Sequence, residues 1–134
     1  MAKLIIEGGA GQGIQLLGLV LANVLNDINY NIALTRKYSA LMRSGKSSIS
    51  LIASKEKIDN PLIETADFEY DLEDKKLQEE LLRKYNNPKV MNMTLLGQIF
   101  KQLNLEVGQE QIRKYLPNKF LEENLQAIKK GYEL

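Results

Sequence analysis

The sequence predicts an α/β fold with a small, mainly parallel sheet and helices toward its C-terminal end. The first observation is an apolar run at residues 3–7 that stops at glycines, which is typical of a buried strand. The second is segment 14–25, which follows the glycines and is apolar on nearly all sides of a helix. The third is another strand pattern at 32–35, which completes a βαβ unit. Because such a helix must be covered on several sides, we expect a three-layer, Rossmann-like sandwich.

The middle of the chain predicts strands on either side of a charged helix. Serine residues alternate with apolar ones over 47–54, and this period of two indicates a half-exposed strand. The charged segment 71–85 has leucines at helical spacing and predicts a surface helix that begins near Asp74. Pro88 ends this segment because proline cannot continue a helix. A last short strand is expected at 89–91.

Three helices are expected after that strand. Apolar residues at helical spacing predict one helix over 94–103 and a shorter one around 109–115. Asn118 is the expected N-cap of the final helix, and Gly131 is the residue at which that helix should stop. Strands are thus expected early in the chain and helices late.

Composition excludes several classes of function. The 134 residues suit one domain, residues 1–134, and they contain no Cys and no His. The chain therefore lacks the usual ligands for zinc, haem or iron-sulfur clusters, a thiol nucleophile and an imidazole base. A net charge of +1 without long runs of one sign argues against nucleic-acid binding. The longest apolar stretch, residues 14–25, is too short to cross a membrane, so we expect a cytoplasmic protein.

A glycine-rich turn lies between the first predicted strand and helix, and it reads Gly8-Gly9-Ala10-Gly11-Gln12-Gly13. Backbone amides at the N-terminus of a helix can hold a phosphate or a carboxylate, whereas glycines also permit close packing of helix on strand. Both interpretations stay open at this point. Gln12 is the side chain of the turn that can both donate and accept hydrogen bonds, so a polar role is expected of it first.

Spacing argues against two common nucleotide motifs in this turn. The dinucleotide fingerprint needs Gly at i, i+2 and i+5, and neither register, from Gly8 or from Gly9, is complete. A phosphate loop of the Walker type needs Lys-Ser or Lys-Thr where this chain has Ile14-Gln15. Gly45-Lys46-Ser47 resembles the tail of such a loop, but it precedes a strand, and we interpret this likeness as coincidence.

Arg43 and a set of four carboxylates are two further candidates for a binding role. Arg43, in a loop with Tyr38 and Gly45, can pair with a carboxylate or a phosphate through its planar guanidinium, or it can face solvent or a partner. Four carboxylates in a row of alternating charge suggest a cation site or the solvated face of a helix, and we interpret them as the latter; they are Glu69, Asp71, Glu73 and Asp74.

The glycine turn and the apolar helix after it resemble the Gly-x-Gly-Gly-Gln-Gly opening of the gamma subunit of 2-oxoacid:ferredoxin oxidoreductases. This family includes pyruvate, 2-oxoglutarate and 2-oxoisovalerate ferredoxin oxidoreductases. Residues 38–45 resemble the family's Tyr-x-x-x-x-Arg-Gly-Gly loop. Residues 92–97 and the ending Gly131-Tyr132-Glu133 are similar to its closing helices.

The chain departs from the family pattern in three places. Ala10 and Ser44 each stand where the family has glycine, which changes how closely a backbone can approach there. After Asp67 the family's sheet continues for several tens of residues, whereas here only the charged stretch 68–89 intervenes before the Asn-Met segment. This difference predicts an internal deletion and a smaller sheet.

The resemblance implies a subunit without catalytic residues of its own. In the family, thiamine diphosphate lies in the alpha and beta subunits, and iron-sulfur clusters lie in the beta and ferredoxin-like delta chains. The assembled complex, such as a pyruvate synthase, oxidatively decarboxylates a 2-oxoacid with coenzyme A to acyl-CoA and passes electrons to ferredoxin. These subunits are the expected partners, coenzyme A contact is an expected role, and a homodimer is one form considered for the isolated chain.

Carried onto this sequence, the resemblance predicts a cofactor-facing or interface role, with no metal ligand, for eight residues: Gly8, Gly9, Gly11, Gln12, Gly13, Tyr38, Arg43 and Gly45. Two other functions stay open. One is a free-standing module that binds NADP or another nucleotide, in which the turn holds a pyrophosphate and Arg36 reads a 2′-phosphate. The other is a truncated assembly scaffold that binds no ligand.

Overall fold

The computed structural model describes residues 1–9, 11–38, 46–60 and 65–133. By its internal contacts the chain divides into two compact units, residues 1–73 and 74–134. Each unit is described by itself below. The single domain that the sequence predicts stays a prediction.

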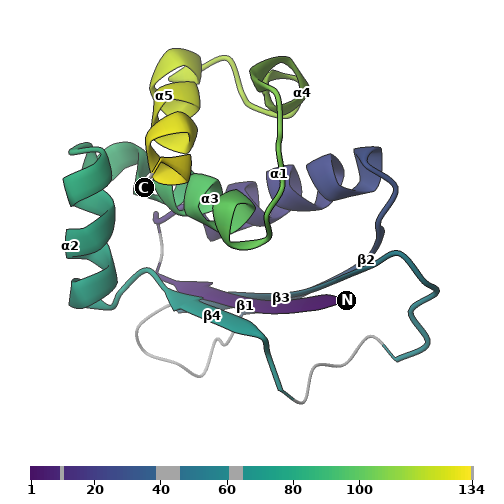
Figure 1. Cartoon of the computed structure of the whole chain (residues 1–134). Coiled ribbons are helices and arrows are strands. Elements are labelled where there is room, and N and C mark those ends of the chain that lie inside the picture. Colours follow the sequence, from purple (N-terminus) through teal and green to yellow (C-terminus); the bar gives the residue numbers. More distant parts are fainter. Residues whose placement is uncertain (10, 39–45, 61–64, 134) are drawn as a thin grey trace. The chain divides into compact units, whose positions relative to one another are not determined.

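The first unit is a four-stranded sheet with one helix. Its elements are β1 (Ala2–Gly8), α1 (Ile14–Asp27), β2 (Asn31–Tyr38), β3 (Ser47–Ser54) and β4 (Phe68–Asp71). The strands lie in the order β2-β3-β1-β4 (Figure 1). The α/β class and the C-terminal helices that the sequence predicts are therefore confirmed, since the second unit is helical.

The expectation of a mainly parallel sheet is wrong for the strand pairs. β3 pairs antiparallel with both β1 and β2, and only the pair of β1 and β4 is parallel among the strands that the structure describes. β1, β2 and β4 nevertheless run in one direction, because two antiparallel pairings in succession restore it. The predicted β1-α1-β2 crossover exists, and β3 occupies the place between its two strands. Periodicity cannot detect such an insertion, because it does not depend on which strands are neighbours.

Helix α1 packs on one face of this sheet. The alternate residues of β1 and β3 that face α1 are buried, Leu4, Ile6, Ile49 and Leu51 among them. Gly18 lets the helix approach, since a Cβ atom at this position would lie 2.5 Å from the Cδ1 atom of Ile49. The third layer of the predicted sandwich stays a prediction.

The second unit consists of helices, and two sequence predictions about it are wrong. Its elements are α2 (Lys75–Lys84), the 3₁₀ helix η1 (Pro88–Val90), α3 (Met91–Gln102), α4 (Gln109–Arg113) and α5 (Leu121–Tyr132). In place of the strand expected at 89–91, the chain forms η1 and enters α3. Phe120, not Asn118, is the N-cap of α5.

Helices α3 and α5 pack backbone against backbone, and Gly131, one residue before the end of α5 at Tyr132, lies at this contact. A Cβ atom on Gly131 would overlap the carbonyl oxygen of Thr94 and lie 2.8 Å from its carbonyl carbon. A Cβ atom on Gly97 would overlap the carbonyl oxygen of Ile128 and lie 2.9 Å from the amide nitrogen of Tyr132. Each helix thus contributes one glycine to the contact (Figure 1).

Candidate functional site

The glycine turn, defined here as residues 8–13, follows the carboxyl end of β1 and leads directly into α1. Gly11 and Gly13 have φ values of 80° and 70°, in the left-handed region that favours glycine. A Cβ atom on Gly8 would lie 2.7 Å from Cγ1 of Ile14, and one on Gly9 would overlap the carboxylate of Glu73. Gly11 and Gly13 are therefore required by the backbone conformation, and Gly8 and Gly9 by the lack of space for a side chain. Ala10 lies outside the described residues.

The side chain of Gln12 connects the turn to the end of β4. Its Oε1 atom accepts a hydrogen bond of 2.6 Å from the amide of Gly9, and its Nε2 atom donates one of 3.1 Å to the carbonyl oxygen of Leu72. The backbone amide of Gln12 also donates to the carbonyl oxygen of Gly9 at 3.3 Å. The polar role expected of Gln12 is thus an internal one, because both ends of its amide bind the chain itself.

We predict that Gln12→Leu loosens the turn and lowers the free energy of unfolding by about 1–3 kcal/mol, because two part-buried hydrogen bonds are lost. Urea unfolding followed by circular dichroism measures this change. Gln12→Glu is the matched comparison, since it keeps the acceptor for Gly9 and removes the donor to Leu72. An unchanged midpoint in both variants would show that the two hydrogen bonds do not hold the turn.

Tyr38, where the predicted segment 38–45 begins, and Ser47, at the start of β3, lie at the same edge of the sheet as Gly8 of the glycine turn. In the register of the sheet, Ser47 lies opposite both Gly8 of β1 and Tyr38 of β2. These three positions form one row across the strands. Of Tyr38 only the backbone is described, and Arg43 and Gly45 lie outside the described residues.

Lys46 lies at this edge as well, and sequence reasoning missed it. Its Nζ atom is 2.7 Å from Oδ2 of Asp71 and 3.1 Å from Oε2 of Glu7, and about a quarter of its side chain is exposed. The hydrogen bond to Asp71, followed by that to Glu7, raises the pKa of Lys46 above its usual value. Its position directly before a strand is the signal that the sequence offers, but its pairing with Glu7 and Asp71 depends on which strands are neighbours, and periodicity does not contain that information.

The carboxyl group of Asp71 has a lowered pKa. Burial is the largest single influence and would raise this pKa, but the hydrogen bonds from Lys46 and from the amide of Glu73, together with the positive charge of Lys46, outweigh burial. A carboxylate with a lowered folded-state pKa stabilises the fold above its unfolded pKa of about 3.9, and this contribution is lost as the pH falls through the folded value.

We therefore predict that the wild-type chain loses stability between about pH 5 and pH 3, and that Asp71→Asn loses less over this interval. Thermal unfolding at a series of pH values measures the difference between the two slopes. Asp59→Asn is a suitable control, since that exposed carboxylate lies outside the site. Parallel slopes for wild type and Asp71→Asn would contradict the assignment.

The four carboxylates at 69–74 do not form one helix face. Glu69 and Asp71 lie on β4, while Asp74 is the N-cap of α2, where its side chain accepts from the amide of Lys76 at 3.1 Å. Within the residues that the structure describes, no group of three or more Asp or Glu side chains could hold a metal ion.

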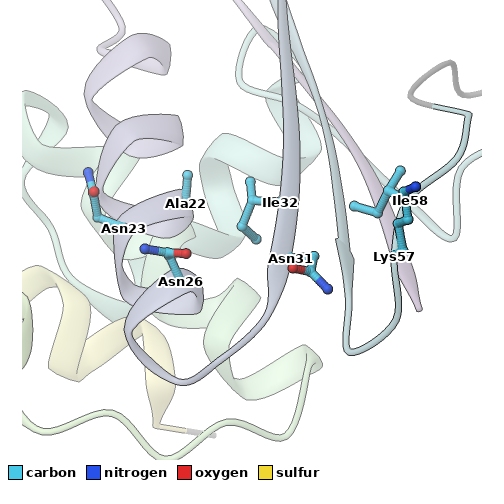
Figure 2. A pocket seen from close by; sticks show the side chains of 7 residues that line it. All are labelled: Ala22, Asn23, Asn26, Asn31, Ile32, Lys57 and Ile58. Atoms are coloured by element: carbon cyan, nitrogen blue, oxygen red, sulfur yellow. The ribbon is translucent and has the colours of Figure 1, made fainter.

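A hollow of about 560 Å³ lies at the opposite end of the same unit, away from the glycine turn. Figure 2 shows Asn23 and Asn26 on α1, Asn31 at the start of β2, and Lys57 beyond β3. Two of these amides already bind backbone carbonyls, since Asn23 donates to Leu19 and Asn31 to Glu56. Of the predicted site residues that the structure describes, none lines this hollow.

Among the described residues, no helix has both the length and the apolar character that crossing a membrane requires.

Comparison with protein families gives one match that covers nearly the whole chain. The family model described as pyruvate ferredoxin/flavodoxin oxidoreductase matches the chain in two parts, residues 3–81 and 70–134, which overlap over 70–81. No curated protein matches the sequence.

Three solved structures have a similar fold. The gamma subunit of a keto/oxoacid ferredoxin oxidoreductase from Geobacter sulfurreducens is 18% identical, with a TM-score of 0.70 over 98% of this chain and 96% of that one. A pyruvate oxidoreductase subunit from Thermotoga maritima is 17% identical, with a TM-score of 0.63 over 98% and 94%. The 2-oxoglutarate:ferredoxin oxidoreductase from Magnetococcus marinus, solved with 2-oxoglutarate, coenzyme A and succinyl-CoA bound, is 16% identical. Its TM-score is 0.75 over 98% of this chain and 30% of that one. At these identities the likeness shows the fold.

Proposed function

The chain belongs to the pyruvate ferredoxin/flavodoxin oxidoreductase family, and from this premise we propose that it is the gamma subunit of a 2-oxoacid:ferredoxin oxidoreductase. The complex would convert a 2-oxoacid and coenzyme A into acyl-CoA and carbon dioxide and pass the electrons to ferredoxin. Its partners would be alpha, beta and ferredoxin-like delta chains. The two parts of the family match overlap over residues 70–81, from the end of β4 into α2, and this break in the match supports an internal deletion after Asp67.

A non-catalytic role follows from what the chain can contribute chemically. With no Cys it cannot ligate an iron-sulfur cluster through thiolates, and with no His it lacks the commonest general base. We therefore assign thiamine diphosphate and the clusters to the partner chains. The 2-oxoacid would be selected there too.

Within the complex, we propose that the glycine turn is a contact surface for a partner subunit. The observation that carries this proposal is the internal bonding of Gln12, whose Oε1 and Nε2 atoms both bind the chain itself and thereby fix the turn. The charges beside the turn point the same way. Among the described side chains beside the turn, the carboxylates of Glu7, Asp71 and Glu73 outnumber the ammonium of Lys46, and a phosphate would meet like charge from them.

Direct contact with coenzyme A is the second candidate function. Its support is the position of the turn at the N-terminus of α1, where backbone amides favour anions, together with a similar fold solved with coenzyme A bound. The two candidates differ in how they respond to charge at the turn.

Glu73→Lys separates the two functions, because Glu73 is exposed and touches the turn at Gly9. For a contact surface, we predict about tenfold weaker association with the partner chains and an unchanged KM for coenzyme A. For a phosphate site, KM for coenzyme A would fall instead. Glu56→Lys is the matched control, since it makes the same charge change on an exposed residue outside the turn.

The measurement is native mass spectrometry after co-expression with candidate alpha, beta and delta chains, followed by steady-state kinetics of the complex. A chain that stays monomeric beside these partners and binds NADPH would overturn the gamma-subunit assignment and favour a free-standing nucleotide-binding module. If the complex assembles and substitutions in the glycine turn leave the dependence of turnover on coenzyme A unchanged, a scaffold role is favoured.

A further inference from the structure

We propose that Lys46 is a positioning residue for the glycine turn, which it holds in place by joining the carboxyl ends of β1 and β4. The effect on the isolated chain follows from the contacts below. The effect on the complex rests, in addition, on the proposed function.

The need for a cation at this edge arises from the register of the sheet. Glu7 of β1 and Asp71 of β4 lie directly opposite each other in the parallel pair. Like charges in this arrangement destabilise strand pairing. The Nζ atom of Lys46 lies 3.1 Å from one carboxylate and 2.7 Å from the other, so it converts a repulsion into two attractions.

The same edge carries the anchor of the turn. The amide of Leu72, the residue after Asp71, donates to the carbonyl oxygen of Glu7 at 2.9 Å, which continues the β1–β4 ladder by one bond. The carbonyl oxygen of Leu72 then accepts from Nε2 of Gln12 at 3.1 Å, and Oε1 of Gln12 accepts from the amide of Gly9 at 2.6 Å. An unbroken series of contacts therefore runs from Lys46 to the turn.

Removing the ammonium acts on this series at its start. In Lys46→Met the two facing carboxylates repel each other without compensation, and the strand ends separate. Leu72 moves with β4, its carbonyl leaves Gln12, and the turn loses its fixed shape. Lys46→Arg keeps the positive charge between the carboxylates and should retain the turn.

Amide hydrogen exchange of the isolated chain tests the positioning role without any partner. We expect the amides of Gly9 and Leu72 to exchange about tenfold faster in Lys46→Met, while amides of α3 keep their rates. Lys57→Met is the matched control, because Lys57 is exposed and lies outside this edge. A uniform rise across the chain, or unchanged rates at Gly9, would overturn the proposal.

A charge-compensated variant keeps the test decisive if Lys46→Met folds poorly. The triple variant Lys46→Met, Glu7→Gln, Asp71→Asn removes the repulsion along with the cation, so slow exchange at Gly9 should return. If the triple variant exchanges as fast as the single one, the ammonium does not act through these carboxylates and the proposal fails.

Association with the partner chains gives the second readout. With wild-type assembly established, Lys46→Met should weaken association about tenfold while Lys46→Arg and Lys57→Met assemble normally. Faster exchange at Gly9 with unchanged association would confirm the positioning role and contradict the use of the turn as a contact surface. The two proposals therefore fail in distinguishable ways.

Discussion

Replacing Gly131 with alanine is expected to lower the free energy of unfolding by about 3 kcal/mol or more. A Cβ atom at this position overlaps the backbone carbonyl of Thr94, and a carbonyl inside a helix cannot rotate away as a side chain could. The relief must come from separating α5 from α3, which opens the buried contact between them.

The sign of this effect separates packing from helix propensity. Alanine in place of glycine inside a helix is intrinsically favourable by about 1 kcal/mol, so propensity alone predicts a more stable protein. Gly97→Ala, on the opposite side of the same contact, should destabilise for the same reason as Gly131→Ala. Gly108→Ala is the control, because its Cβ atom would meet nothing within 4 Å and its φ of −75° suits alanine.

Urea unfolding of the three variants checks this prediction. The expected result is a large loss at positions 97 and 131 and a loss of at most about 1 kcal/mol at 108, which is the N-cap of α4, where alanine is less favourable than glycine. Equal midpoints for all three variants would show that α3 and α5 are not in backbone contact.

The second large effect is expected at the glycine turn, where Gly8→Ala should lower the free energy of unfolding by about 1–3 kcal/mol. The added Cβ atom would lie 2.7 Å from Cγ1 of Ile14 and 2.9 Å from Oε1 of Gln12. It therefore displaces the first turn of α1 and the acceptor that Gly9 uses, and the contact surface of the proposed subunit changes with them.

A second substitution can show that Ile14 is the cause. In the double variant Gly8→Ala, Ile14→Ala, the Cγ1 and Cδ1 atoms of Ile14, each 2.7 Å from the added Cβ atom, are removed. The double variant should therefore be more stable than the sum of the two single changes predicts. A double-mutant cycle from thermal unfolding gives this coupling. Gly11→Ala is the comparison for conformation, since its cost of about 1–2 kcal/mol would come from a φ of 80° with open space around it. Additive effects at positions 8 and 14 would contradict the predicted crowding.

How far the sequence predicts this fold depends on the kind of signal. Helical spacing placed α3 and α4 within a few residues, and Asp74 caps α2 as expected. The prediction of a strand at 89–91 is wrong because Val90 and Met91 are buried by helix packing. A short apolar run has the same pattern in a buried strand and in a buried helix. Strand order depends on which distant segments meet, and periodicity does not contain that information.

The glycines show the same limit. Gly131 was expected to end a helix because glycine commonly does so, whereas here it serves a contact with a helix about forty residues earlier in the chain. The segments 92–97 and 131–133, which carry part of the family resemblance, are the ones that meet at this contact. In this case the motif marks backbone packing.

The sequence predicts the elements that form the candidate site but not the side-chain contacts between them. The turn, its strand and its helix lie where the sequence places them, while the hydrogen bonds of Gln12 are internal to the chain and its role toward a ligand or a partner stays a prediction. The sequence predicts no role for Lys46, because the likeness of Gly45-Lys46-Ser47 to the tail of a phosphate loop is a coincidence. Its two carboxylates come from β1 and β4, and only the register of the sheet brings them within reach of it.

The insertion of β3 between β1 and β2 also constrains the order of folding events. β2 and β3 are consecutive in the chain and can pair as a local hairpin, whereas β1 must wait for partners far downstream, since Gly8 pairs with Ser47 and Leu4 with Phe68. Contacts of long sequence separation slow folding, because the chain must close large loops before they form. β1 is therefore paired on both edges only after β4 has been synthesised, and the glycine turn attached to β1 takes its final shape no earlier than that.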